Sequence, residues 1–268
     1  MSLAGASLAY KKDGSRYYRS SITYKGKHIS LGSFESETLA HRAYLDAFEL
    51  TAATHLGPDD YREGAVLLPF EKWIVITNFR DNGLYIKTPI YLRKNYFDYY
   101  YSPTLVFKFD IDDLFYYSNH KIMKRGSHLF VAEYGLQTTI LSRYGVKSFA
   151  VPGRDFEFIN GDTTDFRYGN IGILNRYYGV TKEQRKGMPV YVTKIHVNGD
   201  YIIGRYPTEE EAAIAYNKAA ESLSAAGFKK DFPENYIETI DEIDYARIYH
   251  MVRLSKKFRN FLESLKVK

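Results

Sequence analysis

The sequence predicts an α+β fold of three small domains, in which two units of a three-stranded sheet plus one helix flank a different middle segment. Two observations predict it: one pattern of short strands, turn and helix occurs near each end of the chain, and only short apolar runs lie between the copies. A chain of 268 residues, 45% of them hydrophobic, is long enough for two or three such domains. The expected divisions are residues 1–62, 63–175 and 176–237, followed by a C-terminal helix over 238–268.

The repeated pattern begins with a hairpin. The first copy covers residues 22–34 and leads directly into 35–44, and the second covers 195–206 and leads into 207–216. Short alternating runs meet at Lys25-Gly26 and at Asn198-Gly199, and Asn-Gly favours the tight turns that match strand twist. Each copy is therefore predicted to be a β-hairpin that feeds a helix.

The helix of each copy has a clear start. Ser36 and Thr208 stand where a side-chain oxygen can cap a helix, and Glu210 and Glu211 add negative charge near the positive end of the second helix dipole. Small residues and one ring recur at helical spacing in both copies: Ala40, Ala43, Tyr44 and Ala47, and again Ala212, Ala215, Tyr216 and Ala219. Small side chains allow the helix to lie close to the sheet, which leaves the opposite sheet face free.

This combination resembles the AP2 domain, the three-stranded DNA-binding module of plant transcription factors and of many phage homing endonucleases and integrases. In the second copy the resemblance rests on residues 177–180, 203–206, 211–220 and 232–236. In the first copy it rests on Tyr18-Arg19, residues 31–34 and Ala43-Tyr44, after an opening strand around Tyr10. The resemblance implies that the sheet binds duplex DNA.

Strand alternation predicts which side chains face outward. Ile22 and Ile195 are expected to point toward the helix, so that their neighbours alternate away from it. The predicted DNA-binding residues are Arg19, Ser21, Thr23, His28 and Ser30 in the first copy, and Lys182, Arg185, Lys186, Lys194 and His196 in the second. The family's arginine and tryptophan base readers are largely missing, which favours phosphate contact over base-specific contact.

The middle segment is predicted to contain short strands over residues 73–79, 84–92, 105–111 and 129–133. Residues 110–114 and 159–170 resemble fixed points of the HNH homing endonucleases, in which an AP2 domain often follows a ββα-metal fold. The order along this chain agrees with that arrangement.

The resemblance also implies that the catalytic residues of the HNH site are lost. An HNH nuclease uses imidazoles to activate water and to help hold a divalent cation. Here Thr138 and Phe158 occupy the expected histidine positions, Phe166 replaces an asparagine, and Asn170 is retained. Asp162, Asp165 and Arg167 also remain, but they can serve loop geometry and capping as well as catalysis. We therefore expect no catalytic residue, no metal and no cofactor.

An enzyme with substitute ligands is the alternative. The seven histidines are scattered, with no pair four residues apart on one predicted helix. His120 and His128 lie nearest the former site in the sequence, so they are the candidates for a replacement metal site.

Charge and composition limit the classes of function that the protein can have. The net charge of +5 is a mild positive excess, but clusters such as Lys182 with Arg185 and Lys186 concentrate the positive charge at particular places. No run of about 18 apolar residues exists to cross a bilayer. The absence of cysteine is compatible with a reducing cytoplasm, where we place the protein.

The predicted function is a non-catalytic DNA-binding protein, derived from an HNH homing endonuclease of a phage or mobile element and acting as a regulator. Double-stranded DNA is the expected partner and a membrane is not. The apolar residues of 238–268 are expected to pack on the protein itself or on a second copy, which would make a homodimer. A working metal-dependent nuclease and a protein-interaction module with an aromatic-rich binding surface are the alternatives.

Overall fold

The computed structural model describes residues 2–148 and 150–266. The chain divides into two compact units, Met1–Ile140 with Asn160–Asn170, and Leu141–Ile159 with Ile171–Lys268. The α+β class is confirmed, because the described residues form helices and small antiparallel sheets. The middle segment 63–175, expected as a domain of its own, is divided between the two units.

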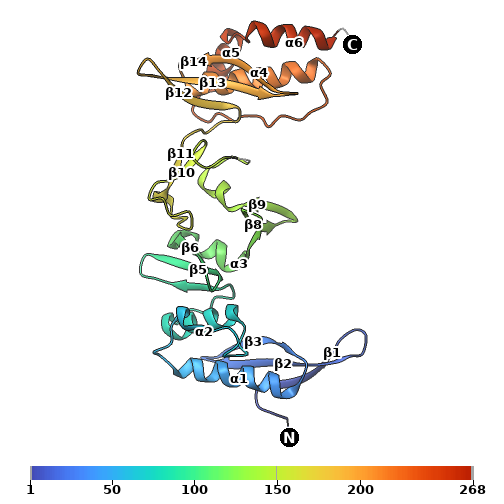
Figure 1. Cartoon of the computed structure of the whole chain (residues 1–268), viewed down its shortest axis with the longest axis vertical. Helices are drawn as coiled ribbons and strands as arrows, with labels where there is room; N and C mark the ends of the chain where they lie inside the picture. Colours follow the sequence, from blue (N-terminus) through green and yellow to red (C-terminus); the bar gives the residue numbers. More distant parts are fainter. Residues whose placement is uncertain (1, 149, 267–268) are drawn as a thin grey trace. The chain divides into compact units, whose positions relative to one another are not determined.

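The first unit begins with a three-stranded sheet covered by a helix. Strands β1 (Ala6–Tyr10), β2 (Arg16–Tyr24) and β3 (Lys27–Phe34) pair antiparallel in chain order. Helix α1 (Glu37–Ala52) lies along one face of this sheet (Figure 1). We call these four elements the first module.

The second unit contains the same arrangement. Strands β12 (Val180–Arg185), β13 (Met188–His196) and β14 (Asp200–Tyr206) pair in chain order, and helix α4 (Glu209–Ala225) packs on one face (Figure 1). We call these elements the second module. Ser36 and Thr208 cap α1 and α4 by accepting bonds from the backbone N–H three residues on, each at 3.2 Å, as the sequence predicts.

The repeated alanines bring each helix onto its sheet. Ala40, Ala43 and Ala47 of α1 have no exposed surface, and neither have Ala212, Ala215 and Ala219 of α4. A methyl side chain adds little thickness between helix and sheet. The predicted close packing of the helix is therefore present in both modules.

A glycine lies under the helix tyrosine in each module. Gly5 and Gly179 have φ of 73° and 67°, and a Cβ built on them would lie 2.2 Å from Tyr44 and 2.3 Å from Tyr216. The carbonyl of Gly5 accepts a bond from the N–H of Ser21 at 3.0 Å, and that of Gly179 accepts one from Lys194 at 2.8 Å. Only glycine combines this backbone conformation with this space.

The two hairpins differ in their turns. Lys25 and Gly26 have φ of 45° and 75°, as a two-residue type I′ turn requires. The predicted tight turn at Asn198-Gly199 is instead a three-residue loop, because pairing ends at His196 with Asp200. The second type I′ turn lies one hairpin earlier, at Lys186-Gly187, with φ of 52° and 80°.

Each module has a β-bulge at the equivalent place. The register shifts after Ser20 in β2 and after Thr193 in β13, which leaves Leu31 and Ile203 as the extra residues of the neighbouring strands. Both extra side chains are fully buried.

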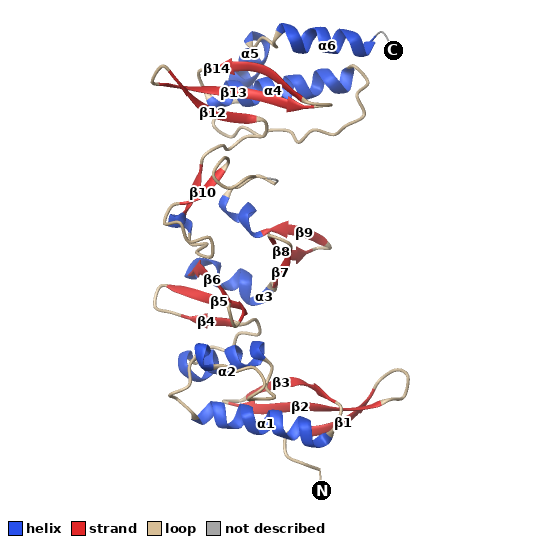
Figure 2. Cartoon of the chain, viewed as in Figure 1, coloured by secondary structure: helices blue, strands red, loops and turns tan. Residues whose placement is uncertain are grey.

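The predicted strand at 73–79 is wrong, because these residues belong to helix α2 (Phe70–Asn82; Figure 2). Residues 73–80 are all buried, so this part of the helix has no polar face to give a helical period, and a short apolar run cannot distinguish a buried strand from a buried helix. Helix α2 packs against α1 and contributes Trp73, Ile74 and Phe79 to the same core as Ile22 and Leu31.

The rest of the middle segment consists of small sheets. The predicted strands at 105–111 and 129–133 correspond to β6 (Leu105–Asp110) and β8 (His128–Glu133), whereas 84–92 is a strand only at β4 (Ile90–Leu92). The other strands are β5 (Tyr96–Ser102), β7 (Ile122–Arg125), β9 (Leu136–Thr139), β10 (Phe156–Phe158) and β11 (Ile171–Ile173). Helix α3 (Leu114–Asn119) follows β6.

The C-terminal segment is two helices, α5 (Glu242–Met251) and α6 (Lys256–Lys266), and not the single predicted helix. Between them Val252 is extended, and Ser255 donates from its N–H and its hydroxyl to the carbonyls of Ile203 and Ile202, at 2.8 and 2.7 Å. Phe258 is fully buried in the core of the second module. Packing on the protein itself is confirmed, and a homodimer through this segment stays a prediction.

No helix among residues 2–148 and 150–266 combines the length and the apolarity that crossing a bilayer requires.

The glycine under Tyr216 can be tested against an open one. We expect Gly179→Ala to destabilise the second unit by about 3 kcal/mol, because the methyl group overlaps the ring and the Lys194 carbonyl. Gly187→Ala is the control: its φ is 80° but nothing lies within 4 Å of an added Cβ, so about 1 kcal/mol is expected. Urea denaturation followed by circular dichroism measures both, and equal losses would contradict the packing argument.

Candidate nucleic-acid interface

The free face of the first sheet carries all five predicted residues of that module. Ile22 pairs with Ile29 on the helix side, and both are buried. Thr23 therefore pairs with His28, and Ser21 with Ser30, on the opposite side. Arg19 lies on that side too and pairs with Ser7 and Ser33.

Arg19 is held in place on this face. Its Nε and Nη2 donate to the hydroxyl of Tyr17 at 3.0 and 2.8 Å, and its guanidinium lies 5.6 Å from the centre of the Tyr17 ring. The surrounding hydroxyls and the His28 ring can each donate or accept a hydrogen bond. The face thus presents one fixed cation among small polar groups.

The free face of the second sheet is more basic. Lys194 pairs with Ile202 and His196 with Asp200, both on the side away from Ile195 and α4. Arg185 pairs with Met188 on the same side, and Lys186 lies in the turn that follows. The Nδ1 atom of His196 lies 2.8 Å from a carboxylate oxygen of Asp200, in an exposed pair.

Lys182 is the exception among the predicted residues. It pairs with Tyr191, which in turn pairs with the buried Tyr206. Residues directly opposite in a sheet point to the same face, so Lys182 lies on the helix side. Lys182 was grouped with Arg185 from the sequence, but two residues that are three positions apart on a strand point to opposite faces.

Several residues of the free faces were missed from the sequence. In the second module Arg205 pairs with Val192 and is exposed on the same side as Lys194. The bulge at Ile203 reverses the alternation between Ile202 and Arg205, so simple counting along β14 fails. Two adjacent apolar residues, Ile202 and Ile203, were the signal in the sequence that could have indicated the bulge. Others on the free faces are Ser7, Tyr17, Ser33, Thr181 and Glu183.

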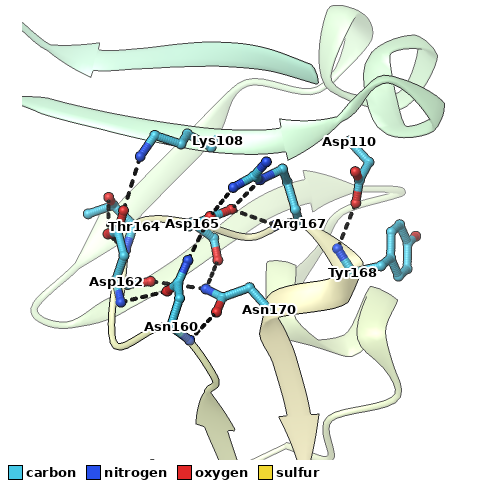
Figure 3. A network of polar contacts seen from close by, with 9 residues as sticks. All are labelled: Lys108, Asp110, Asn160, Asp162, Thr164, Asp165, Arg167, Tyr168 and Asn170. Atoms are coloured by element: carbon cyan, nitrogen blue, oxygen red, sulfur yellow. Dashed lines mark hydrogen bonds and ion pairs between the residues drawn. The ribbon is translucent and has the colours of Figure 1, made fainter. Parts of the chain in front are cut away.

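The loop of residues 160–170, which resembles the HNH motif, docks on strand β6. The N–H of Lys108 donates to the carbonyl of Thr164 at 3.0 Å, and the N–H of Phe166 donates to the carbonyl of Lys108 at 2.8 Å. The Lys108 ammonium also reaches Asp162 at 3.1 Å, and the N–H of Tyr168 donates to Asp110 at 2.6 Å (Figure 3).

Polar side chains close this loop on itself. Figure 3 shows Asn160, Asp165 and Asn170 pointing toward one another. Asn170 accepts a bond from the N–H of Asn160 at 2.7 Å and donates to the carbonyls of Asp162 and Asp165 at 3.2 and 2.8 Å. Asp165 is nearly fully buried and holds the Arg167 guanidinium at 2.9 and 2.6 Å. The retained residues therefore maintain the loop geometry.

The acidic groups of the loop are stabilised in their charged form. Hydrogen bonds from the hydroxyl and N–H of Thr164, together with the Lys108 ammonium, lower the pKa of Asp162 to about 2. Hydrogen bonds from Arg167 lower the pKa of Asp165, and the same pair raises the pKa of the Arg167 guanidinium.

The four former HNH positions have different surroundings. Phe166 is buried, with its ring 5.7 Å from Phe107 and 5.5 Å from Phe109. Thr138 lies on β9 opposite Val131. Phe158 lies on β10 opposite Ile171, in the second unit, and Asn170 belongs to the loop described above.

The two candidate histidines belong to different elements. His120 follows the last residue of α3, with Nδ1 2.9 Å from the Tyr116 carbonyl and its ring stacked on Tyr116. His128 opens β8 and is exposed. Within the described ranges, no three His, Cys, Asp or Glu side chains are grouped so as to hold a metal ion.

Comparisons of the chain with protein-family models, with curated proteins and with solved structures give no match.

Because the loop carboxylates accept hydrogen bonds in their charged form, the stability of the fold is expected to depend on pH. The folded pKa of Asp162, about 2, lies below its ordinary value of 3.8, so the unfolded chain binds more protons between these values. The stability that Asp162 contributes is present above about pH 4 and is lost as pH falls toward 2. Asp165 shifts in the same direction.

We expect Asp162→Asn to reduce the loss of melting temperature between pH 5 and pH 3, measured by differential scanning calorimetry. Asp112→Asn is the control, because Asp112 is exposed on the 3₁₀ turn Ile111–Asp113 that follows β6. Equal acid sensitivity in both variants would show that the bonds of Asp162 do not stabilise the loop.

Proposed function

We propose that the protein binds duplex DNA through the free sheet faces of its two modules without cleaving it. In this proposal it descends from an HNH homing endonuclease with two AP2-like domains, and acts in the cytoplasm as a regulator for a phage or mobile element. The observation that carries the proposal is the repeated sheet with a helix on one face and polar or basic side chains on the other. A sheet of this kind can lie against the grooves and phosphates of DNA.

The second module is suited mainly to phosphate contact. Arg185, Lys194 and Arg205 share its free face, and Lys186 lies at the end of the β12–β13 hairpin. Cations of this kind neutralise phosphates and release counterions, so binding depends strongly on salt. Glu183 and Asp200 lie on the same face. Because their carboxylates repel phosphates, they would favour one alignment of the module along the DNA backbone.

The first module is suited to hydrogen bonding. Its free face has a single guanidinium, Arg19, and shares it with the hydroxyls of Ser7, Ser21, Thr23 and Ser30. Small hydroxyls can donate to or accept from base edges and phosphates alike. Two modules on one chain raise the overall affinity if both reach one duplex, since the second binding step is then intramolecular.

The absence of cleavage is part of the proposal. Asp162 is engaged with Lys108 of β6, Asp165 and Arg167 are engaged with each other, and the buried Phe166 ring occupies an expected asparagine position. A nuclease would need groups free to bind a cation and to take a proton from water.

Binding can be measured by fluorescence anisotropy with labelled genomic duplex fragments at two salt concentrations. We expect Lys194→Ala with Arg205→Ala to raise Kd by tenfold or more, and to reduce the slope of log K against log salt by about 2. Lys182→Ala is the matched control, because it removes a cation from the opposite face of the same sheet. An equal effect of the control would contradict the proposed face.

The first module has its own matched pair. Arg19→Ala should weaken binding, whereas Arg16→Ala, which removes a cation from the first position of the same strand and the other face, should not. Strand cleavage with magnesium or manganese in the same samples would overturn the non-catalytic part of the proposal and favour a nuclease. No retention at either salt concentration would favour a protein partner.

A further inference from the structure

A groove of about 490 Å³ lies in the first unit, beside the β7–β8 hairpin and away from the network of the docked loop. Its wall includes Tyr101, Lys121, Lys124, Arg125 and Phe130, with Glu71 of α2 at the rim. Neither of the sheet faces discussed above contributes to it.

The floor of this groove is firmly held. Tyr99 and Ile122 are nearly fully buried, and the Tyr99 hydroxyl accepts a bond from the N–H of Ile122 at 2.9 Å. This bond ties the start of β7 to β5. A groove with a fixed floor loses little conformational freedom when a ligand enters.

The rim of the groove is basic. Lys121, Lys124 and Arg125 bring three positive charges, and Glu71 brings the one carboxylate, which forms an ion pair with Lys121. Lys124 and Arg125 thus leave an excess of positive charge at the hairpin.

Aromatic rings lie beside these cations. The Arg125 guanidinium is 5.8 Å from the centre of the Phe130 ring, and Tyr101 is about one-third exposed at 36%. Cations next to accessible rings are the combination that binds single-stranded nucleic acid, since phosphates meet the cations and bases stack on the rings.

We propose that this groove binds one nucleotide unit of a single-stranded nucleic acid. The phosphate is held by Arg125, which lies on the same face of the β7–β8 hairpin as Phe130, and the base lies against Tyr101 and Phe130. Lys124, on the opposite face of β7, adds positive charge at the rim. This site is separate from the sheet faces and does not depend on their function.

The test uses the full chain and a labelled single-stranded DNA of 12 nucleotides carrying 5-iododeoxyuridine. Irradiation joins this base to nearby rings, and tryptic digestion then separates residues 95–108, which contain Tyr101, from 126–143, which contain Phe130. We expect crosslinks in one or both of these peptides. Crosslinks confined to other peptides would overturn the proposal.

Affinity for the same oligonucleotide gives a second measurement. Arg125→Ala should raise Kd about tenfold and reduce the salt slope by about 0.7, and Lys124→Ala, on the opposite face of β7, should have a smaller effect on both. Tyr101→Leu, which keeps an apolar side chain, should weaken binding without changing the slope. Lys94→Ala is the control, because Lys94 is an exposed cation in the turn at the other end of β5.

The outcomes separate this site from the sheet faces. Lys194→Ala with Arg205→Ala should leave the crosslinks unchanged, even if duplex binding fails. Competition by adenosine monophosphate would support recognition of a single nucleotide unit, and competition by inorganic phosphate alone would overturn the role of the rings. Unchanged Kd and salt slope in the Arg125 variant would overturn the proposal.

Discussion

The close approach of each helix to its sheet is the constraint on which both modules depend. Tyr44 and Tyr216 lie directly over Gly5 and Gly179, and a side chain on either glycine would occupy the space of the ring. The fully buried alanines continue this contact along α1 and α4. Because the helix occupies one face so closely, the apolar side chains of the strands are satisfied there. The other face is left for polar side chains in the first module, and for basic side chains beside Val192 and Ile202 in the second.

Polar bonding organises the middle of the chain in a different way. Residues 160–170 contribute few apolar side chains apart from Phe166, and their shape comes from Asn160, Asp162, Asp165 and Asn170 bonding to backbone and side-chain groups. The same residue types can hold a metal in an active nuclease. Here each carboxylate has a cation or hydroxyl partner from the protein, so neither charge is left uncompensated.

The two modules share a backbone plan but not a surface. The bulge residues Leu31 and Ile203 and the capping residues Ser36 and Thr208 correspond. The free faces differ, since Arg19 stands among hydroxyls while Lys194 and Arg205 accompany valine and isoleucine. Interior positions are constrained by packing, whereas surface positions can change at little cost to stability. The proposed division between hydrogen bonding and phosphate contact rests on this difference.

Local signals in the sequence determined the two hairpin-and-helix modules, their helix caps and the inward positions of Ile22 and Ile195, because turn residues, caps and alternation act over a few residues. They also placed Arg19, Ser21, Thr23, His28 and Ser30 on one face, since no bulge separates members of that set on the same strand. Only the tertiary structure decided that Trp73–Phe79 is helical, because burial on all sides removes the helical period. It likewise put Lys182 and Arg205 on opposite faces and broke the C-terminal segment at Ser255, because register and the carbonyls of β14 are set by strands far away in the sequence.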